Sequence, residues 1–152
     1  MADVHTSQVR SYNMSRIRSK NTKPELIVRK YLFSLGYHYR LNVAKLPGKP
    51  DIVIGKYKIA IFINGCFWHG HEGHPCFVLP KTKTEWWQNK IKRTQKRDLQ
   101  HIKDLKQKHW NVITIWECQL KPKKKEQTLF QLSVIISQYI LDYYKRQKHS
   151  DT

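Results

Sequence analysis

The strongest indication of the fold comes from one stretch of sequence, Asp51-Ile52-Val53-Ile54-Gly55-Lys56-Tyr57-Lys58-Ile59-Ala60-Ile61-Phe62-Ile63-Asn64. Its first apolar run opens after Asp51, its second covers Tyr57 to Ile63, and Gly55-Lys56 between them is typical of a turn. Short apolar runs rich in β-branched residues are typical of buried strands. The stretch therefore predicts two strands inside a sheet.

The flanking segments add helices and further strands. A helix begins near Thr22-Lys23-Pro24-Glu25, because Pro suits a first turn, and Gly36 ends it. Further along, the expected elements are a weak strand over 37–42, an irregular loop over 64–80, a helix over 84–108, a strand over 112–116 and an amphipathic helix through 129–143. This order, α-β-β-β-loop-α-β-α, predicts an α/β fold of three layers around a mixed central sheet.

Charge narrows the class of partner. The chain has 152 residues with 29 Lys and Arg against 11 Asp and Glu, a net charge of +18. Such a charge favours a polyanion, nucleic acid before an anionic membrane, and an acidic protein is a weaker third choice. No apolar run approaches the ~18 residues of a membrane span, and the opening residues have no apolar signal segment. We expect a cytosolic, monomeric protein with a basic arm over 1–20 and one domain over 21–152.

The loop after the second strand carries a metal-like cluster. Cys66, His71 and Cys76 lie within eleven residues, and Cys118 after the strand 112–116 could complete a closed tetrahedral zinc site. His74 competes with Cys76 for one position. The alternative is a His-rich surface loop with buried thiols. A closed zinc site stabilises a loop but leaves no open position for chemistry, so catalysis belongs elsewhere.

Few carboxylates are available for that chemistry. Asp51 opens a strand and Glu25 lies in the first turn of a helix, and together they could hold Mg²⁺. Asp51 could equally be a strand-entry turn residue, and Glu25 could simply favour the positive end of the helix dipole. His69 is a candidate general base, or another zinc ligand. Three tryptophans, Trp86, Trp110 and Trp116, are expected in the core, and Trp87 could join them.

Several motifs together resemble the very-short-patch repair (Vsr) DNA mismatch endonucleases. They are Arg10-Ser11-Tyr12-Asn13-Met14-Ser15-Arg16-Ile17, Leu46-Pro47-Gly48-Lys49-Pro50-Asp51, Gly65-Cys66-Phe67-Trp68-His69, Pro80-Lys81-Thr82-Lys83-Thr84-Glu85-Trp86-Trp87 and Trp116-Glu117-Cys118. The resemblance implies a restriction-endonuclease-like fold with a zinc-stabilised loop. It also implies Mg²⁺-dependent nicking of double-stranded DNA on the 5′ side of the T in a T·G mismatch, the product of 5-methylcytosine deamination.

The resemblance also implies roles for single residues. Asp51 matches the Mg²⁺-binding aspartate, with the Ile63 backbone carbonyl expected on the same ion, while Glu25 matches a helix carboxylate and His69 the histidine acting on water. Four residues are expected to form a wedge that intercalates into DNA: Phe67, Trp68, Trp87 and Met14. Four others are expected to bind zinc: Cys66, His71, Cys76 (with His74 as the alternative) and Cys118.

One departure bears on catalysis. Nuclease sheets of this type usually carry an acidic-x-Lys pair after the Asp, and familiar Vsr members have Phe-x-His where this chain has Phe62-Ile63-Asn64. An amide cannot act as an acid or base, although Asn64 could hydrogen-bond a phosphate or water. The alternative function is therefore a non-catalytic, zinc-stabilised module that binds distorted or mismatched DNA.

Overall fold

The computed structural model describes residues 21–150, so the proposed arm over 1–20, with Met14, lies outside the described residues. The elements are helix α2 (Lys23–Ser34), strands β1 (Arg40–Leu41), β2 (Ile52–Ile54) and β3 (Ile59–Asn64), helix α3 (Thr84–Gln107), strand β4 (Asn111–Trp116) and helix α4 (Lys125–Ser150), with 3₁₀ turns η1 (Gly55–Tyr57) and η2 (Glu117–Leu120). The expected order of helices and strands is confirmed.

The four strands form one mixed sheet in the order β1-β2-β3-β4. The pairs β1–β2 and β2–β3 are antiparallel, whereas β3 and β4 are parallel. A parallel pair needs a long crossover, and α3 supplies it between β3 and β4. The register pairs Ile59 with Asn111 and Asn64 with Trp116, so β3 and β4 end at the same edge of the sheet.

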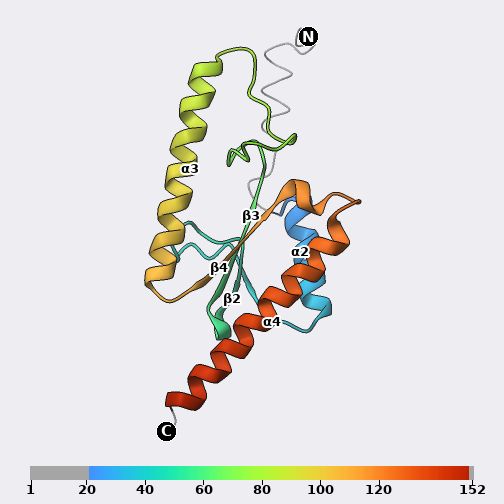
Figure 1. Cartoon of the computed structure of the whole chain (residues 1–152), viewed down its shortest axis with the longest axis vertical. Helices are drawn as coiled ribbons and strands as arrows, with labels where there is room; N and C mark the ends of the chain where they lie inside the picture. Colours follow the sequence, from blue (N-terminus) through green and yellow to red (C-terminus); the bar gives the residue numbers. More distant parts are fainter. Residues whose placement is uncertain (1–20, 151–152) are drawn as a thin grey trace.

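Helices cover both sides of this sheet, with α3 on one side and α2 and α4 on the other (Figure 1). The core lies between the sheet and the pair α2 and α4. It is built from isoleucines of β2, β3 and β4 and from aliphatic side chains of the two helices: Ile52, Ile54, Ile59, Ile61, Ile63, Ile113, Ile115, Val28, Leu32, Leu132 and Ile136. A strand covered on both faces reads as a continuous apolar run, which explains Ile59 to Ile63.

Two further findings concern surfaces. Trp86 is half exposed and does not belong to the core, so the expectation for that residue was wrong. It lies in the first turn of α3, where its ring packs edge-on against Trp87, with 4.8 Å between the ring centroids. Among the described residues, no helix is long and apolar enough to cross a membrane.

Candidate functional site

The site begins where the β2–β3 ladder stops. Continuing the register that pairs Ile52 with Ile61 sets Pro50 opposite Ile63. Proline has no N–H to give to a ladder, and its carbonyl here accepts from Val43. The N–H of Ile63 instead donates to Oδ2 of Asp51 at 2.7 Å. The carboxylate is therefore fixed at the open edge of β3.

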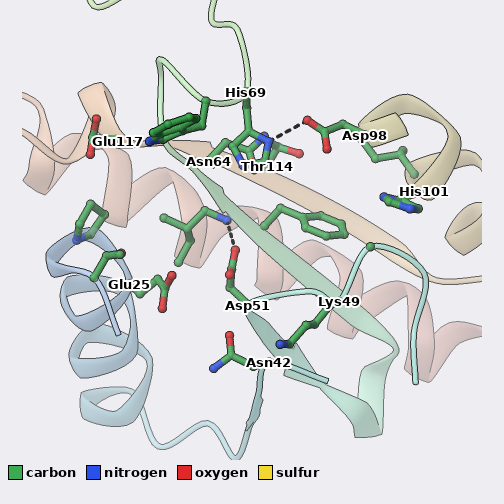
Figure 2. A pocket seen from close by; sticks show the side chains of 18 residues that line it. Glu25, Asn42, Lys49, Asp51, Asn64, His69, Asp98, His101, Thr114 and Glu117 are labelled. Carbon is green, nitrogen blue, oxygen red and sulfur yellow. Dashed lines mark hydrogen bonds and ion pairs between the residues drawn. The ribbon is translucent and has the colours of Figure 1, made fainter. Parts of the chain in front are cut away.

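A pocket of about 700 Å³ surrounds this carboxylate (Figure 2). Asp51, Glu25, His69 and Asn64, the four residues that the sequence singles out as catalytic candidates, all line it. Its other charged or polar lining side chains come from the N-cap of α2, from the loops around β1 and β2, from β4 and η2, and from α3: Thr22, Asn42, Lys49, Thr114, Glu117, Asp98 and His101. Residues from most of the chain thus converge on one cavity.

Burial controls the ionisation of Asp51. Loss of contact with water, and to a smaller extent the nearby Glu25 carboxylate, raise its pKa from 3.8 to about 6. The Ile63 N–H bond, His69 and Arg29 act in the opposite direction without cancelling the effect of burial. An ionised Asp51 is therefore short of positive partners, which is the condition in which a carboxylate binds a cation.

Glu25 is almost fully buried and is already partnered. Its Oε2 accepts from the backbone N–H of Asn21 at 2.7 Å and from Arg29 Nη2 at 3.1 Å. Nη1 of Arg29 donates to the Asn21 side chain at 2.7 Å, which closes the network. A buried ion pair of this kind holds the N-terminal turn of α2 against the pocket wall. Its carboxylate faces the pocket as part of that wall.

His69 pairs with a residue that the sequence reasoning missed. Its Nδ1 lies 2.8 Å from Oδ2 of Asp98 on α3, and both side chains are about one-third exposed. Asp98 was hidden because its neighbours on α3 are mostly basic. No local signal separates Asp98 from Glu85 and Asp104, the other two acidic residues of α3.

A second cluster lies beyond the same sheet edge. Because Asn64 pairs with Trp116, Cys66 and Cys118 each follow two residues after the last ladder pair. The ligand atoms of Cys66, His71, Cys76 and Cys118 all lie within 4.8 Å of one another. Nδ1 of His71 is 3.1 Å from the Cys76 sulfur and 3.5 Å from the Cys118 sulfur. Three thiols and one imidazole this close match the donor set of a structural zinc centre.

The neighbours of this cluster separate the alternatives left by the sequence. His74 is exposed and stacks on the ring of His71, 3.8 Å between centroids, without belonging to the four-residue group. His69 is also outside the group and bonds to Asp98 instead. Burial raises the pKa of the Cys66 and Cys118 thiols and lowers that of His71. Each shift disfavours the charged form where no cation compensates it.

The loop after β3 and the first turn of α3 together form an aromatic cluster. The ring of Phe67 lies 5.0 Å from Trp68 and 5.3 Å from Trp87, and Trp68 lies 5.9 Å from Trp87. The ammonium of Lys90 lies between 5.1 and 5.9 Å from the rings of Trp86, Trp87 and Trp68. Three of the four expected wedge residues are thus together, and Met14 lies outside the described residues.

Comparisons with known proteins agree on one family. The family model described as DNA mismatch endonuclease Vsr matches residues 2–75. The type II nicking enzyme V.NmeAIP of Neisseria meningitidis is 46% identical over 126 residues, which cover 81% of this chain and 87% of that protein. The DNA mismatch endonuclease Vsr of Escherichia coli is 40% identical over 125 residues, 82% of this chain and 80% of that protein. The type II nicking enzyme V.XorIIP of Xanthomonas oryzae is 42% identical, covering 79% and 88%.

The raised pKa of Asp51 predicts a pH-dependent stability. The folded chain holds this proton more tightly than the unfolded chain, so the free energy of unfolding falls as pH rises from about 4 to about 6. In metal-free protein, Asp51→Asn removes the cost of a buried charge and should stabilise the fold by about 3 kcal/mol near pH 8. Near pH 4 the gain should largely vanish. Urea unfolding of the variant and the unaltered chain at both pH values measures this difference in the free energy of unfolding.

Asp104→Asn is the matched control, because the Asp104 carboxylate also accepts a hydrogen bond, from the side chain of Gln100, but does not line the pocket. It should give no such pH-dependent gain. Equal destabilisation by Asp51→Asn at both pH values would contradict the assignment of a desolvated, uncompensated carboxylate.

Proposed function

This chain belongs to the Vsr DNA mismatch endonuclease family, and on that basis we propose that it nicks duplex DNA on the 5′ side of the T in a T·G mismatch. Membership implies a restriction-endonuclease-like fold, in keeping with the mixed sheet and its flanking helices. The observation that carries the proposal is the desolvated Asp51 carboxylate in one pocket with the His69–Asp98 pair. This combination suits hydrolysis of a phosphodiester.

Asp51 is the proposed Mg²⁺ ligand, with the backbone carbonyl of Ile63 beside it. The N–H and C=O of one strand residue point to the same edge, and the N–H of Ile63 points to Asp51. The proline opposite Ile63 cannot donate to that carbonyl. When bound, Mg²⁺ would stabilise negative charge on the phosphate and on the leaving oxygen. A buried carboxylate without a full complement of positive partners fits this ion.

His69 is the proposed general base. An ionised Asp98 only accepts hydrogen bonds, so Nδ1 of His69 carries the hydrogen between them and Nε2 is left as the basic nitrogen. The carboxylate also stabilises the imidazolium formed when Nε2 takes a proton from water. Asn64 lines the same cavity and can donate its amide N–H to a phosphate oxygen or a water, without moving a proton. Glu25 would act indirectly, because it forms part of the pocket wall and its negative charge raises the pKa of Asp51.

DNA binding rests on charge and on aromatic surface. The net charge of +18 supplies phosphate contacts that weaken as salt rises. Phe67, Trp68 and Trp87 are the proposed wedge, with Met14 of the arm entering at the same place. Inserting rings costs a few kcal/mol of unstacking, and the cost is least at a mismatched pair. The wedge would thus favour damaged DNA.

The remaining parts complete the proposal. Zn²⁺ held by Cys66, His71, Cys76 and Cys118 would tie the loop after β3 to the end of β4, and so hold Phe67, Trp68 and His69 in place. Residues 21–152 would act as one domain and 1–20 as an arm on the DNA. We further propose a monomer that works in the bacterial cytosol.

Nicking tests the proposed function. The substrates are end-labelled duplexes with T·G or C·G at one position, in several sequence contexts, with Mg²⁺ or EDTA. We expect one Mg²⁺-dependent cut 5′ of the mismatched T and no cut in the C·G duplex. Asp51→Asn should abolish the cut while leaving T·G binding within about threefold, and His69→Ala should slow it by about 10²–10⁴-fold.

Asp104→Asn should cut like the unaltered chain, because Asp104 does not line the pocket. Tight, mismatch-selective binding with no cut in any context would refute the nuclease and favour the non-catalytic module, with Asn64 as the position where activity was lost.

Zinc is tested by two neighbouring histidines. The purified chain should contain about one zinc per molecule, and His74→Ala should retain it because His74 is outside the four-residue group. His71→Ala should lose most of the zinc and lower the melting temperature. Elemental analysis and thermal unfolding measure both. Loss of zinc from His74→Ala but not from His71→Ala would overturn this ligand set.

The wedge is tested by mismatch preference. Phe67→Ala with Trp68→Ala should reduce the ratio of T·G to C·G affinity by about tenfold, since aromatic stacking on a base contributes about 1–3 kcal/mol. Competition binding measures the ratio, with Phe33→Ala as the control because Phe33 is an exposed ring on α2. An unchanged ratio in the double variant would remove the wedge from the account.

A further inference from the structure

The charges of the pocket present a problem for an anionic substrate. Four carboxylates line it, from Glu25, Asp51, Asp98 and Glu117. Within the part of the chain that the structure describes, Lys49 is the only Lys or Arg that lines it, although the whole chain has 29. Arg29 pairs with Glu25, but the other three carboxylates still present like charge to a DNA phosphate that enters this cavity, and one divalent ion at Asp51 offsets only part of it. A permanently charged donor is needed close to the phosphate.

The sheet itself does not provide that donor. Nuclease sheets of this type usually carry a lysine on the strand after the aspartate, whereas β3 ends Ile63-Asn64 and continues with Gly65. His69 and His101 also line the pocket, but an imidazole is not permanently charged near neutral pH. This chain thus has no cationic side chain at the end of β3, and the nearest lysine to Asp51 in the pocket is Lys49, in the turn before Asp51.

The backbone of that turn is held in an unusual conformation. Gly48 and Lys49 have φ of +77° and +50°, and Lys49 lies between Gly48 and Pro50. A non-glycine residue with positive φ costs roughly 1–2 kcal/mol. A Cβ on Gly48 would lie 2.9 Å from Cβ of His101, so the turn packs tightly on α3. The N–H of Lys49 donates to Leu46 O at 3.0 Å.

These constraints fix where the Lys49 side chain starts, two residues before Asp51. Figure 2 shows it on the side of the pocket that also carries Asp51 and Asn42. Its side chain is exposed at the rim, and within residues 21–150 no carboxylate forms an ion pair with it. Local strain that persists at a cavity is typical of functional positions. An unpaired ammonium held beside a metal-type carboxylate is suited to a phosphate oxygen.

We propose that Lys49 binds a non-bridging oxygen of the DNA phosphate at or next to the nicking site, and so supplies from the turn the cation that β3 lacks. This inference rests on the proposed function and adds a substrate-binding residue to the same pocket. Its ligand is a backbone phosphate, so the contact carries no base preference.

Kinetics of three variants test the contact. Lys49→Ala should lower the single-turnover nicking rate by about 10²-fold, the lower end of the range for loss of one donor to developing charge. Lys49→Arg should restore most of the rate, because it keeps the charge. Lys45→Ala is the matched control, since it removes one exposed lysine from the same loop without touching the pocket. It should nick within about twofold of the unaltered chain.

Binding to modified DNA gives a readout that a merely structural role would not move. Single methylphosphonates, which remove one phosphate charge, are placed in turn at the positions around the nick, and affinity is measured in EDTA. At one position the modification should weaken binding by the unaltered chain and by Lys45→Ala, but add little to the loss in Lys49→Ala. Losses that add at every position would overturn the proposal, as would nicking by Lys49→Ala at the control rate.

Failure of the proposed function looks different. If the unaltered chain nicks no duplex, the endonuclease activity fails, and the methylphosphonate cycle then decides alone whether Lys49 contacts a phosphate. If the unaltered chain nicks T·G DNA and the cycle is additive, the inference about Lys49 fails while the nuclease stands.

Discussion

The hydrogen bond from the Ile63 N–H to the Asp51 carboxylate organises the edge of the sheet that borders the pocket. It exists because Pro50 falls where the antiparallel ladder would otherwise continue, and a proline cannot donate to that ladder. The Ile63 N–H therefore donates to the Asp51 carboxylate in place of a backbone carbonyl. One residue without an N–H thus converts a sheet edge into a site with a desolvated acid.

Parallel pairing of β3 and β4 explains why the other functional groups gather at the same end. Both strands end at one edge, so the residues that follow them, including Cys66 and Cys118, meet beyond the sheet. The loop between β3 and α3 carries His69 and two rings of the aromatic cluster, Phe67 and Trp68. Helix α3 supplies the third ring, Trp87, and brings Asp98 to the imidazole. The Cys and His cluster and the pocket around Asp51 therefore both lie at the sheet edge that this strand pairing creates.

Much of this arrangement could be predicted from the sequence. The order of helices and strands follows from apolar periodicity and from glycine and proline, and the Cys and His spacing brought four candidate ligands to notice. Asp98 and Lys49 could not be found this way, because their importance comes from contacts across elements that no local pattern encodes. Trp86 was misassigned because size alone suggests burial, whereas the first turn of α3 leaves its ring half exposed.

Direct titration of the Asp51 carboxyl by carbon-detected NMR, with and without Mg²⁺, tests the central claim most closely. In metal-free protein the account predicts a pKa of about 6, because burial outweighs the positive groups nearby. Mg²⁺ should then lower that pKa by at least one unit, since the ion stabilises the ionised form. A pKa near 4 in the absence of metal, or one that does not respond to Mg²⁺, would contradict the account.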